Sequence, residues 1–197
     1  MTPPPAAASS RLWLVRHAAP LVPPGTCYGA WDVPADAQAT CAAAEQLSTA
    51  LPPGTRVAYS TLQRCELLAH ELQALRPDLT FTPDARLREM DFGRWEGKTW
   101  DAIGKSDIDA WVAGFATHAP GGGESLAHML HRVAAALQTA QAWRTEQGAG
   151  DVVWITHAGV ARCVAWLQER GESALPRSDD WPVAAPGWGD WEIRQLA

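Results

Sequence analysis

Apolar residues along the chain gather in short unbroken runs, with longer, more mixed stretches between them. The runs at 12–15 and 152–155 contain Trp, Val, Leu and Ile without polar alternation. Such runs are typical of interior strands in a sheet that is covered on both faces. Runs at 56–60 and 79–82 predict two more strands, and residues 191–196 predict a final edge strand.

The stretches between the strands have apolar residues three or four positions apart, which predicts helices. A loop rich in Pro and Gly, residues 20–34, follows the first strand and is typical of a segment that lines a substrate. Strands that alternate with helices indicate an α/β fold. The helices are expected from Asp36 to Leu51, at 61–75, from about 125 to 143 and at 160–170, with a broken helical segment at 98–115 that covers the site.

Length and charge limit the classes of protein to which the chain can belong. Its 197 residues suit one α/β domain, expected at 11–197, behind a disordered leader at 1–10. The net charge of −6 argues against nucleic acid and against an acidic membrane as partners. No window approaches the roughly 20 apolar residues of a membrane-spanning helix, and we expect a cytoplasmic protein.

Cysteine and histidine spacing gives no strong metal motif. The four cysteines are scattered without a Cys-x-x-Cys pair, which is typical of a reduced cytosolic protein. His128 and His131 lie three residues apart with Glu124 one turn earlier, but pairs of this kind are common by chance. We therefore expect no metal site.

Two of the predicted strands end in histidine. Arg16 and His17 follow the first apolar run, and Pro20 prevents regular continuation. His157 follows the run at 152–155, immediately before a predicted helix, where free backbone N–H groups favour phosphate. A third strand end leads into a helix whose first turn carries Arg64. Ligands collect beyond the carboxyl ends of strands in open α/β sheets, so these residues are candidates for one anion site.

These segments, together with an acidic loop, resemble the histidine phosphatase superfamily, also called the phosphoglycerate mutase-like family. Arg16-His17 is similar to the family's Arg-His-Gly signature, and Ser60 to Arg64 is similar to its second phosphate-binding segment. Glu89, four residues before Gly93, is similar to the family's acid, and His157 to its second histidine. The segments occur in the family's order and span most of the chain.

The resemblance implies a fold and a mechanism. The fold is a three-layer sandwich with a mostly parallel central sheet flanked by helices on both faces. His17 would attack a phosphomonoester and form a phosphohistidine, while Glu89 protonates the leaving alcohol. Arg16, Arg64 and His157 would bind the phosphoryl oxygens, with guanidinium and imidazolium groups supplying the positive charge. No metal and no cofactor are implied.

Two positions depart from this pattern or compete with it. Ala18 stands where the signature usually has Gly, and we expect the small methyl group to be tolerated. Asp91 is the alternative to Glu89 as the acid. Glu96 is expected to hold the acidic loop through backbone hydrogen bonds.

The loop after His17 is similar to the α-ribazole phosphatase branch of the family. Tyr28-Gly29 and Asp32-Val33-Pro34 carry this likeness, which suggests α-ribazole 5′-phosphate, a step in cobalamin assembly, as the substrate. Trp31, Trp95 and Trp100 lie in segments expected near the mouth, where an aromatic wall could stack on a flat base, while core packing is the expected use for most of the chain's tryptophans. Thr26 and Cys27 are candidates for a hydrogen bond to phosphate.

Two other functions are also compatible with the sequence. One is a cofactor-dependent phosphoglycerate mutase, although 197 residues leave little room for the insertion found in that branch. The other is a non-catalytic phosphate-binding protein. The expected partner is a small phosphorylated substrate, and a homodimer is the one protein assembly that we keep open.

Overall fold

A computed structural model describes residues 10–147 and 150–196 of the chain. All but the last residue of the predicted leader therefore lies outside the described residues. The strands are β1 (Arg11–Arg16), β2 (Arg56–Tyr59), β3 (Thr80–Pro83), β4 (Val152–Thr156) and β5 (Trp191–Gln195). The helices are α1 (Ala37–Ala50), α2 (Gln63–Leu75), α3 (Lys105–Ala113), α4 (Leu126–Gln147) and α5 (Ala158–Arg170).

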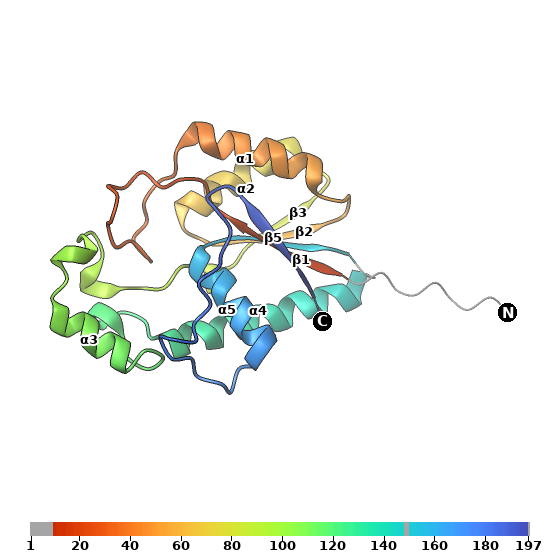
Figure 1. Cartoon of the computed structure of the whole chain (residues 1–197). Coiled ribbons are helices and arrows are strands. Elements are labelled where there is room, and N and C mark those ends of the chain that lie inside the picture. Colours follow the sequence, from red (N-terminus) through yellow and green to blue (C-terminus); the bar gives the residue numbers. More distant parts are fainter. Residues whose placement is uncertain (1–9, 148–149, 197) are drawn as a thin grey trace.

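The strands form one sheet in the order β3-β2-β4-β1-β5. β1, β2, β3 and β4 are parallel, and β5 pairs antiparallel with β1 at the edge. Helices α1 and α2 lie on one side of the sheet, and α4 and α5 lie on the other (Figure 1). The predicted three-layer α/β sandwich with a mostly parallel sheet is confirmed.

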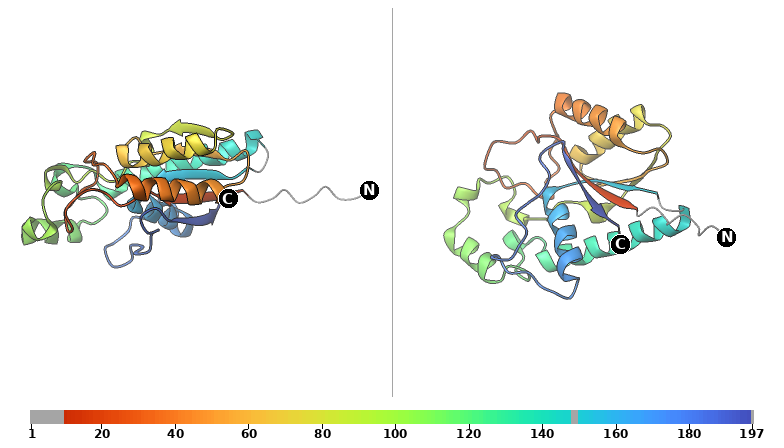
Figure 2. Two further views of the ribbon diagram at one scale, coloured as in Figure 1. Left: turned by 90° about the horizontal axis from the view of Figure 1, so that it is seen from above. Right: turned by 45° about the vertical axis from the view of Figure 1, so that its right-hand side comes forward.

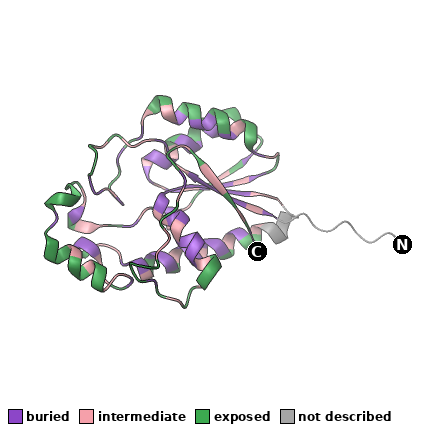
Figure 3. Cartoon of the chain, in the orientation of Figure 1, coloured by how far each residue is buried: buried purple, intermediate pink, exposed green. Residues whose placement is uncertain are grey.

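Each face of the sheet has its own apolar core, because successive side chains of a strand point to opposite faces. Leu12, Leu14 and Trp154 pack against α4 and α5. Trp13 and Val15 pack against α1 and α2. Figure 3 shows this burial as purple strands and inner helix faces, with green outer faces on α1 and α3. The unbroken apolar runs of β1 and β4 follow from burial on both sides.

Side chains cap the start of two helices. Asp36 caps α1 by accepting a hydrogen bond from the backbone N–H of Ala39 at 2.7 Å. Ser125 precedes α4, and its Oγ accepts one from His128 N at 3.3 Å. None of the helices that the structure describes combines the length and apolar character needed to cross a membrane.

The predicted broken segment over the site is a cap on one end of the sandwich. This cap contains α3 and the short 3-10 turn Trp100–Ala102. Two more 3-10 turns, Gly93–Trp95 and Pro120–Gly122, lie beside it. Both views in Figure 2 keep this green segment at the same end of the sheet. β1 and β4 run toward that end, so the cap lies over the carboxyl ends of the parallel strands.

Asp151 ties the two central strands together at their other end. Its carboxylate accepts hydrogen bonds from the Arg11 backbone at 3.1 Å, from the Arg11 guanidinium at 2.7 and 2.9 Å, and from Trp13 Nε1 at 2.9 Å. The Asp151 side chain is 8% exposed. Because its removal would leave buried donors unpaired, the carboxylate stabilises the start of β1 and β4.

We predict that Asp151→Ala lowers the free energy of unfolding by about 2–4 kcal/mol, since Trp13 Nε1 and the Arg11 backbone lose their acceptor. Urea denaturation followed by Trp fluorescence measures this change. Asp109→Ala is the control, because Asp109 pairs with Lys105 on the exposed surface of α3 and should change stability by less than about 0.5 kcal/mol. Equal losses in both variants would contradict the prediction.

Candidate active site

The parallel register brings the two candidate histidines together. Arg16 of β1 is paired with Thr156 of β4, so the next residue in each strand, His17 and His157, lies at the same edge of the sheet. The two imidazole ring centroids are 5.1 Å apart. Ser60 follows β2 on the other side of β4, and its backbone N–H bonds Ile155 O at 2.9 Å.

The His17 ring is held in one tautomer. Its Nδ1 lies 2.7 Å from the carbonyl oxygen of Ala18, and because a carbonyl can only accept, Nδ1 carries the proton. Nε2 is then left with a free lone pair. Burial, followed by the charges of Arg64 and Arg16, lowers the pKa of His17 to about 3, so the ring is neutral near pH 7.

Residue 18 contributes to this arrangement through its backbone. The group that orients His17 is the Ala18 carbonyl oxygen, and the Ala18 methyl is 1% exposed. Neither observation requires a glycine. This supports the expectation that Ala is tolerated at the signature position.

His157 is buried like His17. It is 1% exposed, and Nε2 lies 2.8 Å from Ser60 Oγ and 3.5 Å from Cys65 Sγ. Burial, and then the charge of Arg64, lowers its pKa well below 6.5. The expectation that imidazolium groups supply positive charge therefore does not hold for the free site, where both rings are neutral and the guanidinium groups carry the charge.

Arg64 is a fully buried cation. Its side chain is 0% exposed, Nη1 bonds Trp31 O at 2.9 Å, and Nη2 bonds Gly29 O at 2.6 Å. Within the described residues no carboxylate lies within ion-pair distance of it, and Nε has no hydrogen-bond partner. Burying a charge without a counter-ion is costly, and a bound anion would offset that cost.

The loop that resembles the α-ribazole branch holds Arg64 in place. Asp32 Oδ1 accepts the backbone N–H of Gln63 at 2.7 Å and so caps α2. Gly29 is required because a Cβ there would lie 1.8 Å from the carbonyl oxygen of Met90. Within this chain, the Tyr-Gly and Asp positions thus have a structural role around the buried guanidinium.

Arg16 lies at the wall of the same cavity. Nη1 bonds the carbonyl oxygen of Pro186 at 3.1 Å, and the guanidinium lies 5.2 Å from the ring centroid of Trp188. Its Nε is buried without a hydrogen-bond partner among the described residues. Arg16 and Arg64 therefore both have donors available for an anion beside His17.

Glu89 is the one carboxylate among the described residues that line the cavity. Oε1 accepts the Met90 N–H at 3.0 Å, and Oε2 accepts the Gly159 N–H at 3.0 Å. A Cβ at Gly159 would lie 2.1 Å from Oε1, so only glycine leaves room for the carboxylate. Asp91, the alternative acid, is exposed and bonds Gly93 N, outside the cavity.

Arg132 of α4 holds the loop that carries Glu89, a role that sequence reasoning missed. Its guanidinium makes two hydrogen bonds to the carboxylate of Glu124, at 2.7 and 2.8 Å. It also donates to the carbonyl oxygens of Arg86, Arg88 and Glu89 at 2.7, 2.6 and 3.3 Å. Glu124 thus fixes Arg132, while the next residue, Ser125, caps α4.

Glu96 connects the acidic loop to the loop after His17. Oε1 accepts the N–H groups of Ala30 and Phe92 at 2.8 and 2.9 Å, and Oε2 accepts that of Trp31. The predicted backbone-holding role is confirmed. Cys27 is fully buried against Trp95, and burial raises the pKa of its thiol to about 12. It does not line the cavity, whereas Thr26 does.

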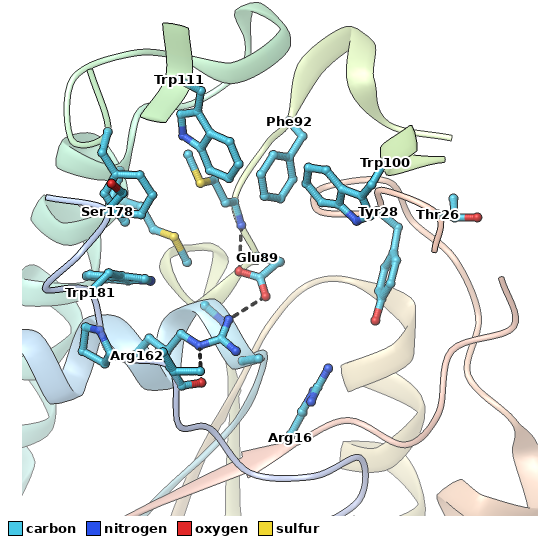
Figure 4. A pocket seen from close by; sticks show the side chains of 18 of the residues that line it. Arg16, Thr26, Tyr28, Glu89, Phe92, Trp100, Trp111, Arg162, Ser178 and Trp181 are labelled. Atoms are coloured by element: carbon cyan, nitrogen blue, oxygen red, sulfur yellow. Dashed lines mark hydrogen bonds between the residues drawn. The ribbon is translucent and has the colours of Figure 1, made fainter. Parts of the chain in front are cut away.

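The cavity has a volume of about 580 Å³ and aromatic walls. Trp111 stacks on Trp100 with centroids 6.3 Å apart, and Phe115 meets both Trp111 and Trp181. Figure 4 shows Phe92, Trp100 and Trp111 above Glu89, with Trp181 opposite Tyr28. The aromatic residues that line it are Tyr28, Phe92, Trp100, Trp111, Phe115 and Trp181.

Of the three tryptophans expected near the mouth, Trp100 lines the cavity and Trp31 and Trp95 do not. Trp95 is 3% exposed and packs behind Trp100 and Trp111 in a small core under the cap. Trp31 lies at the surface beside Gly97. The place of a tryptophan in a segment near the cavity did not determine whether its ring faces the cavity.

Two of the residues considered for a metal site contact other side chains instead. His131 lies 2.9 Å from Glu172, and Glu124 is bonded to Arg132. In the described part of the chain, no three His, Cys, Asp or Glu side chains are placed to share a metal ion.

A model of the histidine phosphatase superfamily, branch 1, matches residues 12–179. The chain belongs to this superfamily. It is an enzyme of the phosphoglycerate mutase-like hydrolase type, and its fold matches that of solved phosphatases in the superfamily. A search of curated proteins found no significant match.

Solved structures of two other proteins resemble nearly the whole chain. A mycobacterial glucosyl-3-phosphoglycerate phosphatase is 27% identical, with a TM-score of 0.75 over 94% of this chain and 89% of the other. That protein has also been solved with inorganic phosphate. Protein TTHB049 from Thermus thermophilus is 29% identical, with a TM-score of 0.63 over 93% and 92%.

We predict that the free energy of unfolding decreases as the pH is lowered below about 6.5. The folded protein keeps His17 and His157 neutral, whereas the unfolded chain protonates both. The loss develops between about pH 6.5 and 3, at up to about 1.4 kcal/mol per pH unit for each ring. Urea denaturation at a series of pH values measures this slope. His17→Gln should have a shallower slope than the wild type, and identical slopes would contradict the prediction.

Proposed function

We propose that this histidine phosphatase superfamily member is a metal-independent phosphomonoesterase that acts on a small phosphorylated metabolite through a phosphohistidine intermediate. The observation that carries the proposal is the oriented, neutral His17, which lines a cavity with two guanidinium groups that have no carboxylate partner among the described residues. A neutral imidazole is nucleophilic, and guanidinium groups stabilise the charge on phosphoryl oxygens.

The proposed reaction has two in-line transfers. His17 Nε2 attacks phosphorus, the bond to the bridging oxygen breaks, and protonated Glu89 gives its proton to that oxygen, releasing the alcohol. The Glu89 carboxylate then takes a proton from water, which attacks phosphorus and breaks the P–N bond. Inorganic phosphate leaves, and both His17 and Glu89 return to their starting states.

The other groups have supporting roles in this proposal. Arg16 and Arg64 bind the equatorial oxygens, and neutral His157 contributes a ring N–H beside them. The Ala18 carbonyl, already bonded to Nδ1–H, stabilises the positive charge that develops on the His17 ring when it is phosphorylated. Positive charge from guanidinium groups makes a metal unnecessary in this scheme.

Two specific substrates are candidates. α-Ribazole 5′-phosphate is supported by the loop at Tyr28 and Asp32 and by the aromatic wall, on which a flat base could stack. A phosphorylated sugar acid is supported by the mycobacterial glucosyl-3-phosphoglycerate phosphatase, which covers nearly the whole chain at 27% identity. A cytoplasmic location fits either metabolite.

His17→Ala is expected to lower phosphate release by at least about 1,000-fold with the fold intact, because the nucleophile is lost. Phosphate release is measured with EDTA present on p-nitrophenyl phosphate, α-ribazole 5′-phosphate, glucosyl-3-phosphoglycerate, 3-phosphoglycerate and nucleotide monophosphates. The control is His131→Ala, since His131 lies on the exposed side of α4.

Rapid quenching of the wild type should trap an acid-labile, base-stable phosphoryl group that is absent from His17→Ala. Wild-type turnover that disappears with EDTA would contradict metal independence. Conversion of 3-phosphoglycerate to 2-phosphoglycerate without phosphate release would identify a mutase instead. Near-wild-type release by His17→Ala would exclude His17 as the nucleophile.

Arg132→Met is expected to reduce kcat about 10–100-fold for an alkyl phosphate and much less for p-nitrophenyl phosphate. Loss of Arg132 frees the Glu89 loop, and a nitrophenolate leaving group requires little protonation. The control is Arg86→Met, because Arg86 also bonds α4, at Ala135 O, yet does not touch Glu89. An equal loss on both substrates would show that Arg132 does not act through the acid.

A further inference from the structure

The segment that joins α5 to β5 ends in a tight turn, residues 187–190, directly before β5. The Asp190 N–H donates to Gly187 O at 3.2 Å and closes the turn. Gly189 has a φ of 79°, which glycine adopts without strain, and a Cβ at Gly187 would lie 2.6 Å from Asp190 Oδ2. The two glycines therefore leave Trp188 as the large side chain at the tip of the turn.

The backbone of this turn is bonded to the end of β1, next to the nucleophile. β5 pairs antiparallel with β1, and the turn continues that pairing beyond the last residues of the two strands. The Arg16 N–H donates to Asp190 O at 3.0 Å, and the Gly189 N–H donates to Arg16 O at 3.2 Å and to His17 O at 3.1 Å. The turn is therefore fixed in place beside Arg16.

The same turn contacts the Arg16 side chain in two ways. Nη1 donates to the carbonyl oxygen of Pro186 at 3.1 Å, and the guanidinium lies over the Trp188 ring, 5.2 Å from its centroid. Nε is buried without a hydrogen-bond partner among the described residues. A cation over an aromatic face is attracted by the ring without needing a hydrogen bond. Trp188 therefore holds Arg16 while Nε stays available to an anion.

Trp188 itself lies outside the cavity and outside the apolar cores. Arg16 lines the cavity, whereas Trp188 does not. The Trp188 ring is 53% exposed and is absent from the cores that the described residues form. The segment is also held without this ring, by the pairing of β5 and by a hydrogen bond from Arg162 Nε to Val183 O at 3.2 Å. Trp188 can therefore affect a bound phosphoryl group only through Arg16.

Arg16 needs such support because its side chain is long and has no ion pair in the described part of the chain. Figure 4 shows Arg16 below Glu89 and Tyr28, pointing toward them. Fixing a flexible side chain before the substrate arrives reduces the entropy that is lost on binding. A carboxylate could fix it as well, but would compete with a phosphoryl group for the same donors. An aromatic ring avoids this competition because it has no negative charge.

We propose that Trp188 is a positioning residue that holds the Arg16 guanidinium in the orientation that binds the phosphoryl group. This inference rests on the proposed phosphomonoesterase function and adds to it a residue outside the cavity. The ring touches no reacting atom, so its loss should weaken binding of the phosphoryl oxygens in the ground state and in the transition state alike. The expected result is a higher KM and weaker binding of inorganic phosphate, with a smaller change in kcat.

Trp188→Leu should lower kcat/KM for p-nitrophenyl phosphate about 5–20-fold, mainly through KM, and should raise the Kd of inorganic phosphate by a similar factor. Calorimetry measures that Kd without turnover. Trp188→Phe keeps an aromatic face and should stay within about three-fold of the wild type. The matched control is Trp143→Leu, because Trp143 lies 5.3 Å from the guanidinium of Arg56 at the start of β2, outside the cavity. This control should change KM by less than about two-fold.

A double-mutant cycle with Arg16→Gln separates positioning from a general structural effect. Adding Trp188→Leu to Arg16→Gln should change kcat/KM and the phosphate Kd by less than about two-fold, because the group that Trp188 orients is already gone. p-Nitrophenyl phosphate is used because its good leaving group keeps slow variants measurable. The thermal midpoint of Trp188→Leu should lie within about 2 °C of the wild type, since the ring is half exposed.

Three results would overturn the proposal. One is an unchanged KM and phosphate Kd in Trp188→Leu, and another is a loss in Trp188→Phe as large as that in Trp188→Leu. The third is an equal effect of Trp188→Leu in the wild type and in Arg16→Gln, which would show that the ring acts independently of Arg16. Failure of the proposed function would look different, because hydrolysis of p-nitrophenyl phosphate would then not depend on His17.

Discussion

The parallel pairing of β4 with its two neighbours is the constraint on which the site depends. Because Arg16 is in register with Thr156 and Tyr59 with Ile155, the residues that follow the three strands meet at one sheet edge. A slip of one residue in either pair would turn alternate side chains to the other face and separate the two histidines. The two apolar cores, one on each face of the sheet, oppose such a slip because they require the present alternation.

Burial then decides the charge state of each group at that edge. A histidine can respond to desolvation by losing its proton, so both rings are neutral, whereas a guanidinium cannot. Arg64 accordingly remains charged at 0% exposure, where the carbonyl oxygens of Trp31 and Gly29 accept its hydrogen bonds and the Tyr28 ring lies 5.5 Å from the guanidinium. The free site therefore combines neutral imidazoles with guanidinium groups that have no carboxylate partner among the described residues, an arrangement that a bound anion would stabilise.

Beyond Glu89 the cavity has a different construction. The end of the cavity that holds Arg16 and His17 is built from strand ends, whereas the rest is built from the cap, from α5 and from the segment around Trp181. Loops on a rigid scaffold can vary without disturbing the sheet. The residues that resemble the family's signature thus lie at the sheet edge, whereas the rest of the cavity wall comes from segments that the sheet does not constrain.

The sequence by itself determined the order of strands and helices, the α/β class and the grouping of Arg16, His17, Arg64 and His157, because local periodicity and strand-end position carry that information. It did not reveal the contacts of Arg132 and Arg162, whose partner carbonyls lie 43 to 46 and 21 residues away in the chain. The sides on which Trp31 and Trp95 lie were equally undetermined. Tertiary structure decided these points because loop side chains follow no periodic pattern. In addition, a residue of any type can supply the backbone carbonyl that binds a distant guanidinium, so the sequence does not show which residues do so.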